Sequence, residues 1–276
     1  MPTPSIGRTI AIAVIILLVA WTALRSLGAR PPAAPGAAMP KPAVDAPLAN
    51  QKSPETAVFA GGCFWGVQAV FEHTKGVISA TSGYSGGFVK DPSYETVSMG
   101  VTGHAESVSV VYDASQISYG QLLMIYFSVA HDPTQLNRQG PDSGAQYRSS
   151  IFYTGEEQKR IAEAYVAQLT AAKIYNRPIV TKIVAFAAFY PAEDYHQDYL
   201  KHHPDNPYIQ INDLPKLEEL KRQFPGLYRN DAGCGRRRNP PGRSLGRAGP
   251  LLLLWPQVMN SRPCSRYSGS RVIRAQ

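Results

Sequence analysis

Strand-like and helix-like segments alternate between residues 55 and 229, and this alternation limits the fold more than any other feature of the chain. Alternating apolar or β-branched runs predict strands at 57–60, 77–82, 106–112, 149–153 and 179–186. Long loops rich in glycine and proline occupy residues 83–103 and 131–148, and loops of this length are usually functional. We therefore predict an α+β domain over residues 55–229. It has two layers: a ferredoxin-like mixed or antiparallel sheet with helices on one face, and long functional loops.

Helical signals lie between the predicted strands. The pattern Ser118-x-x-Gln121 is a capping box in front of an apolar run. The pattern Thr154-x-x-Glu157 predicts a second helix, whose apolar residues Ile161, Tyr165 and Leu169 share one face. A further helix is predicted from Ala192 to His202, directly after a proline.

Positive charge is concentrated at the end of the chain. The 276 residues include 28 Lys and Arg and 20 Asp and Glu, a net charge of +8 that would favour nucleic acid or an anionic membrane as a partner. Residues 1–229 are neutral, with 19 basic and 19 acidic side chains, so the whole excess lies in residues 230–276. We therefore expect no nucleic-acid partner and interpret 230–276 as a basic, disordered tail. A basic anchor for anionic lipid or nucleic acid is the alternative.

The N-terminal segment, residues 1–28, carries an apolar run from Thr9 to Leu24 behind Arg8. As a helix this run rises ~24 Å, short of the ~30 Å hydrocarbon core of a bilayer. Its position predicts an export signal or a membrane anchor, with the protein in the bacterial periplasm or at the inner membrane. Cleavage and topology stay open. Residues 29–54 are rich in Ala and Pro and predict an extended linker.

Cys63 follows two glycines at the turn between a predicted strand and a predicted amphipathic helix containing Val67, Val70 and Phe71. In the first turn of that helix, free N–H groups and the helix dipole would stabilise a thiolate, which predicts a nucleophile. The alternative is a buried structural cysteine. The other cysteines, Cys234 and Cys264, are too distant in sequence for a disulfide framework or a zinc site.

Eight sequence blocks resemble, in order, those of the A-type peptide methionine sulfoxide reductases. They are GGCFWG (61–66), GYSGG (83–87), PSY (92–94), GHAE (103–106), HDP (131–133), GPD (140–142), QYRS (146–149) and AEDYHQDY (192–199). The resemblance implies reduction of the S epimer of methionine sulfoxide, in proteins or free, and repair of oxidised proteins. We expect the protein to be a monomer.

The resemblance also implies a role for each matching residue. Cys63 is the nucleophile and becomes a sulfenic acid, while Glu106 is the acid that assists the sulfoxide oxygen. Tyr94 and Tyr147 donate their phenol protons to that oxygen, and Asp142 belongs to the polar wall of the site. Glu106 must be buried to keep its proton near neutral pH.

An apolar cage for the substrate methyl group is implied for Phe64, Trp65 and Tyr199. No metal or bound cofactor is implied. An external, thioredoxin-like thiol would regenerate the enzyme, and Cys234, between small residues, is the candidate resolving cysteine. Direct reduction of a one-cysteine enzyme is the alternative.

Two other functions remain open from the residues alone. Cys63 could pair with His104, His131 or His196 in a cysteine hydrolase or acyltransferase. The domain could also be a membrane-tethered binding module without turnover. A zinc deaminase is excluded because His104-Ala105-Glu106 lacks any P-C-x-x-C partner. His196, His202 and His203 are interpreted as a solvated helix end and not as metal ligands.

Overall fold

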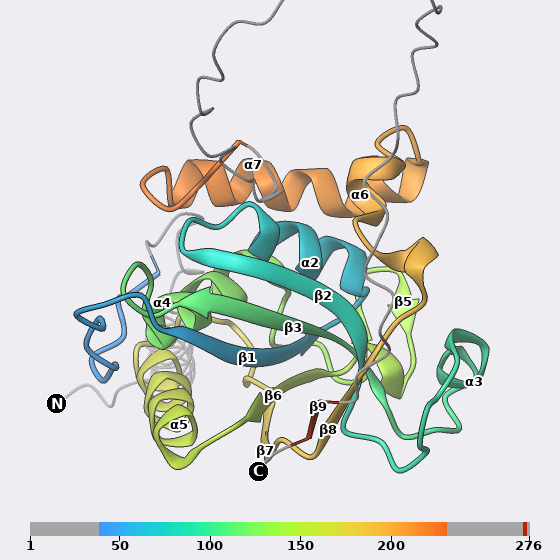
Figure 1. Cartoon of the computed structure of the whole chain (residues 1–276), viewed down its shortest axis with the longest axis horizontal. Helices are drawn as coiled ribbons and strands as arrows, with labels where there is room; N and C mark the ends of the chain where they lie inside the picture. The colour runs from blue at the N-terminus through green and yellow to red at the C-terminus, as the bar shows by residue number, and fades with distance from the viewer. Residues whose placement is uncertain (1–38, 231–272, 275–276) are drawn as a thin grey trace, which may run out of the picture.

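The structure is a computed structural model that describes residues 39–230 and 273–274 (Figure 1). The predicted signal or anchor at 1–28 lies outside these residues, as do Cys234 and Cys264 in the tail. In the described part of the chain, no helix combines the length and apolar character needed to cross a membrane.

The main sheet contains seven of the described strands, in the order β7-β6-β1-β3-β2-β8-β9. Their bounds are β1 (Pro54–Gly61), β2 (Val77–Ser85), β3 (Ala105–Asp113), β6 (Ser149–Tyr153), β7 (Lys182–Ala185), β8 (Ala188–Pro191) and β9 (Ile273–Arg274), and β4 (Arg138–Gln139) pairs separately with β5 (Asp142–Ser143). The central β6-β1-β3-β2 strands are antiparallel in the ferredoxin-like order, whereas β7 is parallel to β6 and makes the sheet mixed. The predicted fold class is confirmed.

Helices and short helical turns connect these strands. Their bounds are α2 (Phe64–Glu72), α3 (Tyr94–Ser98), α4 (Tyr119–Ile125), η1 (Tyr126–Ala130), η2 (Ala145–Tyr147), α5 (Glu156–Ala171), η3 (Asp194–His196), α6 (Tyr199–His202), η4 (Ile209–Asp213) and α7 (Leu214–Gln223). The capping box predicted at Ser118 is present, because its side chain accepts from Gln121 N–H and Gln121 bonds back. The helix predicted behind Thr154 is confirmed as α5, with Ile161, Tyr165 and Leu169 buried, although Gly155 is its N-cap residue and makes no side-chain cap bond.

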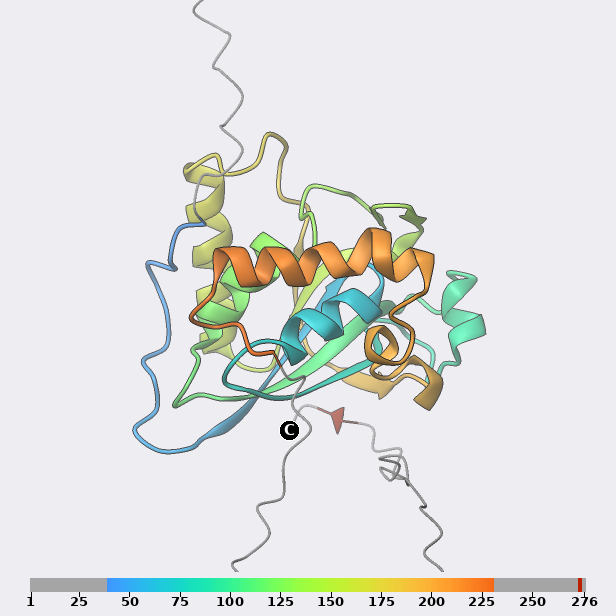
Figure 2. The ribbon, with the colours of Figure 1, turned by 90° about the horizontal axis from the view of Figure 1, so that it is seen from above.

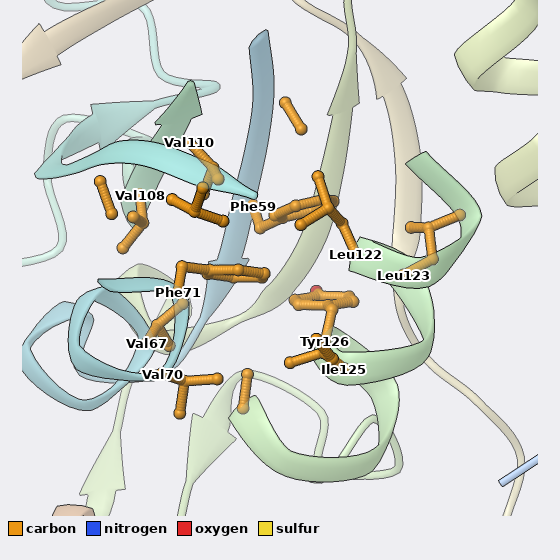
Figure 3. Packing of buried hydrophobic residues seen from close by; sticks show 14 of the residues in the cluster. Phe59, Val67, Val70, Phe71, Val108, Val110, Leu122, Leu123, Ile125 and Tyr126 are labelled. Carbon is orange, nitrogen blue, oxygen red and sulfur yellow. The ribbon is translucent and has the colours of Figure 1, made fainter. Parts of the chain in front are cut away.

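The core lies between one face of the sheet and helices α2, α4 and α5. Figure 3 shows Phe59 of β1 beside Phe71 of α2 and Tyr126 at the end of α4. The opposite face of the sheet carries a smaller apolar cluster that includes Val58 and Phe152. Adjacent residues of a strand point to opposite faces, which explains this division. Helix α7, which the sequence pattern missed, crosses over α2 on the side away from the sheet (Figures 1 and 2).

The helix predicted from Ala192 to His202 is wrong. The turn η3 and the short helix α6 are separated at Asp198, whose φ is +52°. The side-chain amide of Gln197 donates to the carbonyl of Ser82 and its oxygen accepts from the N–H of Ser82. This segment therefore satisfies its polar groups against strand β2 instead of within one continuous helix.

Residues 39–53, the described part of the predicted linker, lie against the domain without forming a helix or strand. The Tyr165 hydroxyl donates to the carbonyl of Pro40 over 2.8 Å. The Asp45 carboxylate accepts from the N–H of Gly120 at the start of α4 over 2.8 Å. A Cβ atom at Gly120 would lie only 2.5 Å from the Asp45 carboxyl carbon. The segment also packs Met39, Val44, Ala46 and Ala49 against the core, but these residues follow no regular apolar period in the sequence.

Candidate active site

Cys63 lies between the end of strand β1 and the first residue of helix α2. Gly62 has a φ of +88°, and a side chain at this position would collide with Gln139, so only glycine fits the turn. Cys63 is the N-cap residue of α2 and is 8% exposed. The predicted strand-to-helix turn is confirmed, and the thiol is at the end of the helix where backbone N–H groups are free.

Several groups around Cys63 change the pKa of its thiol in opposite directions. Burial raises the pKa of the Cys63 thiol well above its ordinary value, and the carboxyl groups of Glu106 and Asp213 raise it further. A backbone bond from Trp65 and the ammonium of Lys216 lower the pKa by less. The stabilisation of a thiolate by the helix end stays a prediction, and burial together with the two carboxyl groups opposes it.

Glu106 of strand β3 is 3% exposed and lies at the same helix end. The N–H of Phe64 donates to its Oε2 over 3.0 Å. Burial nevertheless raises the pKa of Glu106 to about 8, and the charge of Asp142 adds to this effect. The burial predicted for Glu106 is confirmed. Its carboxyl group retains a proton at neutral pH and can donate it.

Tyr94 at the start of α3 and Tyr147 at the end of η2 come from the two long loops. Burial raises the pKa of both phenols, and the charges of Glu106, Cys63 and Asp142 act in the same direction on each. Both tyrosines therefore lie within electrostatic reach of the thiol and the acid, with their protons retained at neutral pH. The structure thus brings together the five predicted residues Cys63, Glu106, Tyr94, Tyr147 and Asp142.

The apolar side of the site is built on Trp65 of helix α2. Its indole stacks on Tyr199 with ring centroids 3.7 Å apart and planes 6° apart. The indole N–H donates to Nδ1 of His196 over 3.1 Å. Phe64 is fully buried next to this pair, with its ring centroid 5.1 Å from that of His196. The three residues predicted for the apolar cage therefore share one aromatic cluster.

The histidines do not form the pair with Cys63 that a cysteine hydrolase needs. His104 accepts from the N–H of Gly87 and donates to the carbonyl of Val89. His131 donates to the carbonyl of Tyr126 and bonds Ser149 through Nε2. His196 accepts from Trp65, and its other ring nitrogen has no partner among the described residues. None of these hydrogen bonds joins a ring nitrogen of the three histidines to Sγ of Cys63.

The prediction that His196 lies with His202 and His203 at a solvated helix end is wrong for His196. It is 3% exposed, whereas His202 and His203 are exposed. Burial lowers the pKa of His196, so the ring is neutral at neutral pH. Within residues 39–230 and 273–274, no three His, Cys, Asp or Glu side chains are grouped as metal ligands would be.

Sequence reasoning missed Tyr208, which follows α6. Its hydroxyl donates to Oδ2 of Asp142 over 2.5 Å, and its ring meets Trp65 edge-on with centroids 5.9 Å apart. Tyr208 thus connects the polar wall to the apolar one. The sequence signal that could have identified Tyr208 is its place directly after Asn206-Pro207, nine residues beyond the end of the last recognised block at Tyr199.

This arrangement combines a thiol, a protonated carboxyl group and two phenols with an aromatic wall. Proton donors on one side and aromatic rings on the other suit a group that carries both a polar oxygen and an apolar substituent.

Comparisons with known proteins agree with this chemistry. Residues 55–226 match the family model described as peptide methionine sulfoxide reductase. The chain is 63% identical over 174 residues to "Peptide methionine sulfoxide reductase MsrA 2" of Mesorhizobium japonicum, covering 63% of this chain and 89% of that protein. It is 49% identical over 175 residues to MsrA of Thermus thermophilus, covering 63% and 98%. The crystal structure of Mxr1 from Saccharomyces cerevisiae in reduced form shares 31% identity with a TM-score of 0.52, covering 59% and 92%. The chain belongs to the peptide methionine sulfoxide reductase family.

Proposed function

We propose that this protein reduces the S epimer of methionine sulfoxide, in peptides and proteins or free, to methionine. The observation that carries the proposal is the placement of Cys63 and the protonated Glu106 at one helix end, below the Trp65 aromatic cluster. The repair of oxidised proteins follows from this activity, because methionine sulfoxide is a common oxidative lesion.

The reaction transfers the sulfoxide oxygen to Cys63. Sγ of Cys63 attacks the sulfoxide sulfur and forms an Sγ–S bond. The oxygen then moves to Sγ: the Sγ–O bond forms while the S–O bond and the Sγ–S bond break, which leaves a sulfenic acid on Cys63 and releases methionine. Thiol plus sulfoxide gives sulfenic acid plus thioether, so Cys63 loses the two electrons that the substrate sulfur gains. Glu106 gives its proton to the oxygen, and its carboxylate then accepts the thiol proton. This exchange explains how a buried, protonated thiol can react.

Selectivity for one epimer follows from the two unlike walls. The phenols of Tyr94 and Tyr147 bind the oxygen, and the cluster of Phe64, Trp65 and Tyr199 surrounds the methyl group. In the other epimer these two substituents exchange places, which sets the oxygen against aromatic rings and leaves donors without a partner.

Regeneration requires two further thiol groups. Two thiols reduce the sulfenic acid to the Cys63 thiol, releasing water and forming one disulfide. Cys63 is the only cysteine in residues 39–230, so a resolving thiol comes from Cys234, from Cys264 or from another molecule. We propose a thioredoxin-like reductant, with Cys234 as the resolving residue.

The N-terminal segment 1–28 is proposed to export or anchor the protein, which would place it in the periplasm or at the inner membrane. N-terminal sequencing of the mature protein from fractionated cells tests this proposal. An intact Met1 in the soluble cytosolic fraction would contradict it.

The activity is tested by incubating the full chain with dithiothreitol and separate S and R epimers of a methionine sulfoxide peptide. We expect consumption of the S epimer alone and none with Cys63→Ser. Binding of the S epimer without consumption would instead identify a binding module. Thioredoxin as sole reductant, with and without Cys234→Ser, tests the resolving role; equal turnover would discard it.

A further inference from the structure

A buried ion pair lies against the first turn of helix α2, and no step of the reaction described above is assigned to it. Nζ of Lys216 is 3.1 Å from Oδ1 of Asp213, and their side chains are 18% and 0% exposed. Asp213 is the last residue of η4, and Lys216 lies in the first turn of α7. The helix that crosses over α2 therefore brings both charges to it.

Gly66 makes the close approach possible. A Cβ atom at Gly66 would overlap the Asp213 carboxylate and lie 2.7 Å from Nζ of Lys216. Gly66 is three residues after Cys63, so it shares the first helical turn with the thiol. The glycine after the nucleophile thus has a physical reason: it admits an ion pair next to the reactive end of the helix.

The pair is poorly suited to a purely stabilising role. Oδ2 of Asp213 is buried without a hydrogen-bond partner among the described residues, and burial raises the pKa of Asp213. A buried ion pair with an unsatisfied oxygen costs free energy of desolvation that its own attraction repays only in part.

The groups around Cys63 are mostly acidic. Glu106 from β3 and Asp213 from η4 oppose ionisation of the thiol, and Lys216 from α7 is the cation that favours it. Four further groups face the same space. They are the phenols of Tyr94 in α3, Tyr147 in η2 and Tyr208 just before η4, and the carboxylate of Asp142 in β5. The neutral ring of His131 packs on Gly61, just before the thiol.

We propose that the Asp213–Lys216 pair sets how readily Cys63 loses its proton. The ammonium of Lys216 stabilises the thiolate as it forms, and Asp213 holds that ammonium against Gly66 while reducing its effect. Both are positioning residues that act through Cys63. The inference rests on the proposed function and deepens it, but the reactivity of Cys63 can be measured without a sulfoxide substrate.

The test measures the rate of Cys63 alkylation by iodoacetamide as a function of pH, in the full chain carrying Cys234→Ser and Cys264→Ser. We expect Lys216→Met to move the midpoint of the profile up by about one pH unit, and Asp213→Asn to move it down by a similar amount. The double variant should return close to the starting midpoint. Lys216→Arg keeps the charge and should keep the midpoint.

Lys221→Met is the matched control, because Lys221 lies on the same helix at an exposed position. It should leave the profile unchanged. A purely structural role would move both single variants in one direction or neither, and that result in chains that melt normally by circular dichroism would overturn the proposal. If Lys216→Met fails to fold, the downward shift in Asp213→Asn decides alone. Opposite shifts without sulfoxide reduction would reject the proposed function but retain this inference.

Discussion

The indole N–H of Trp65 donates to Nδ1 of His196 over 3.1 Å, and this bond defines both the position of the indole and the tautomer of the imidazole. Because Nδ1 accepts, the proton of the neutral ring is on Nε2. Tyr94 and Phe64 pack against the same ring, with centroids 4.3 Å and 5.1 Å from it. His196 therefore fixes the position of Trp65 and packs against Phe64 and Tyr94.

Removing the acceptor at His196 should weaken substrate binding more than turnover. We expect His196→Phe to raise KM for a methionine sulfoxide peptide about tenfold, the value of one lost hydrogen bond, with a smaller change in kcat. His196→Asn keeps an acceptor near the Nδ1 position and should restore most of the affinity. Steady-state kinetics checks this, and an equal loss in both variants would contradict the role of the acceptor.

Glu106→Gln should remove the proton donor while keeping the shape of the side chain. We expect kcat/KM to fall about 10²- to 10⁴-fold, the usual contribution of general acid catalysis. In the wild type, kcat/KM should fall as pH rises through about 8, because the carboxyl group is protonated below that pH and ionised above it. The variant should lack this descending limb. Glu157→Gln, on the exposed face of α5, is the control and should leave the profile intact.

Tyr208 and Asp142 should be energetically coupled. Tyr208→Phe removes the hydroxyl that donates to Asp142 but keeps the ring against Trp65. We expect about a tenfold loss in kcat/KM, and a similar loss in Asp142→Asn. A double-mutant cycle measured by steady-state kinetics should show that the double variant loses much less than the product of the two. Independent, multiplying losses would mean that the bond has no part in catalysis.

Asp45→Ala should destabilise the fold without changing the active site. The variant removes the acceptor for the N–H of Gly120 and the hydroxyl of Ser118 at the start of α4. We expect a loss of about 1–2 kcal/mol in the free energy of unfolding, as for a removed helix cap. Urea denaturation measures it, with kcat/KM unchanged in the folded variant. An unchanged urea midpoint would show that the bonds of Asp45 to the start of α4 do not contribute to stability.

The strands and the central helices were predictable because their signals are local. Alternation along β1 and β3, the capping box at Ser118 and the shared face of Ile161, Tyr165 and Leu169 are each contained within a few residues. The first turn of α2 was predictable for the same reason, since glycines before Cys63 mark a tight turn. Segments that bond to distant strands were not predictable. The side-chain amide of Gln197 bonds the backbone carbonyl and N–H of Ser82, and this contact replaces the continuous helix expected there.

The sequence by itself determined which residues are candidates for the chemistry: Cys63, Glu106, Tyr94, Tyr147 and the aromatic wall all occur in recognisable blocks. Only the tertiary structure decided their state. Burial raises the pKa of the Cys63 thiol, and the carboxyl groups that β3 and η4 bring next to it act in the same direction. The partners His196, Tyr208, Asp213 and Lys216 reach the site through packing across more than a hundred residues. A pKa depends on surrounding dielectric and charge in space, and local sequence patterns record neither.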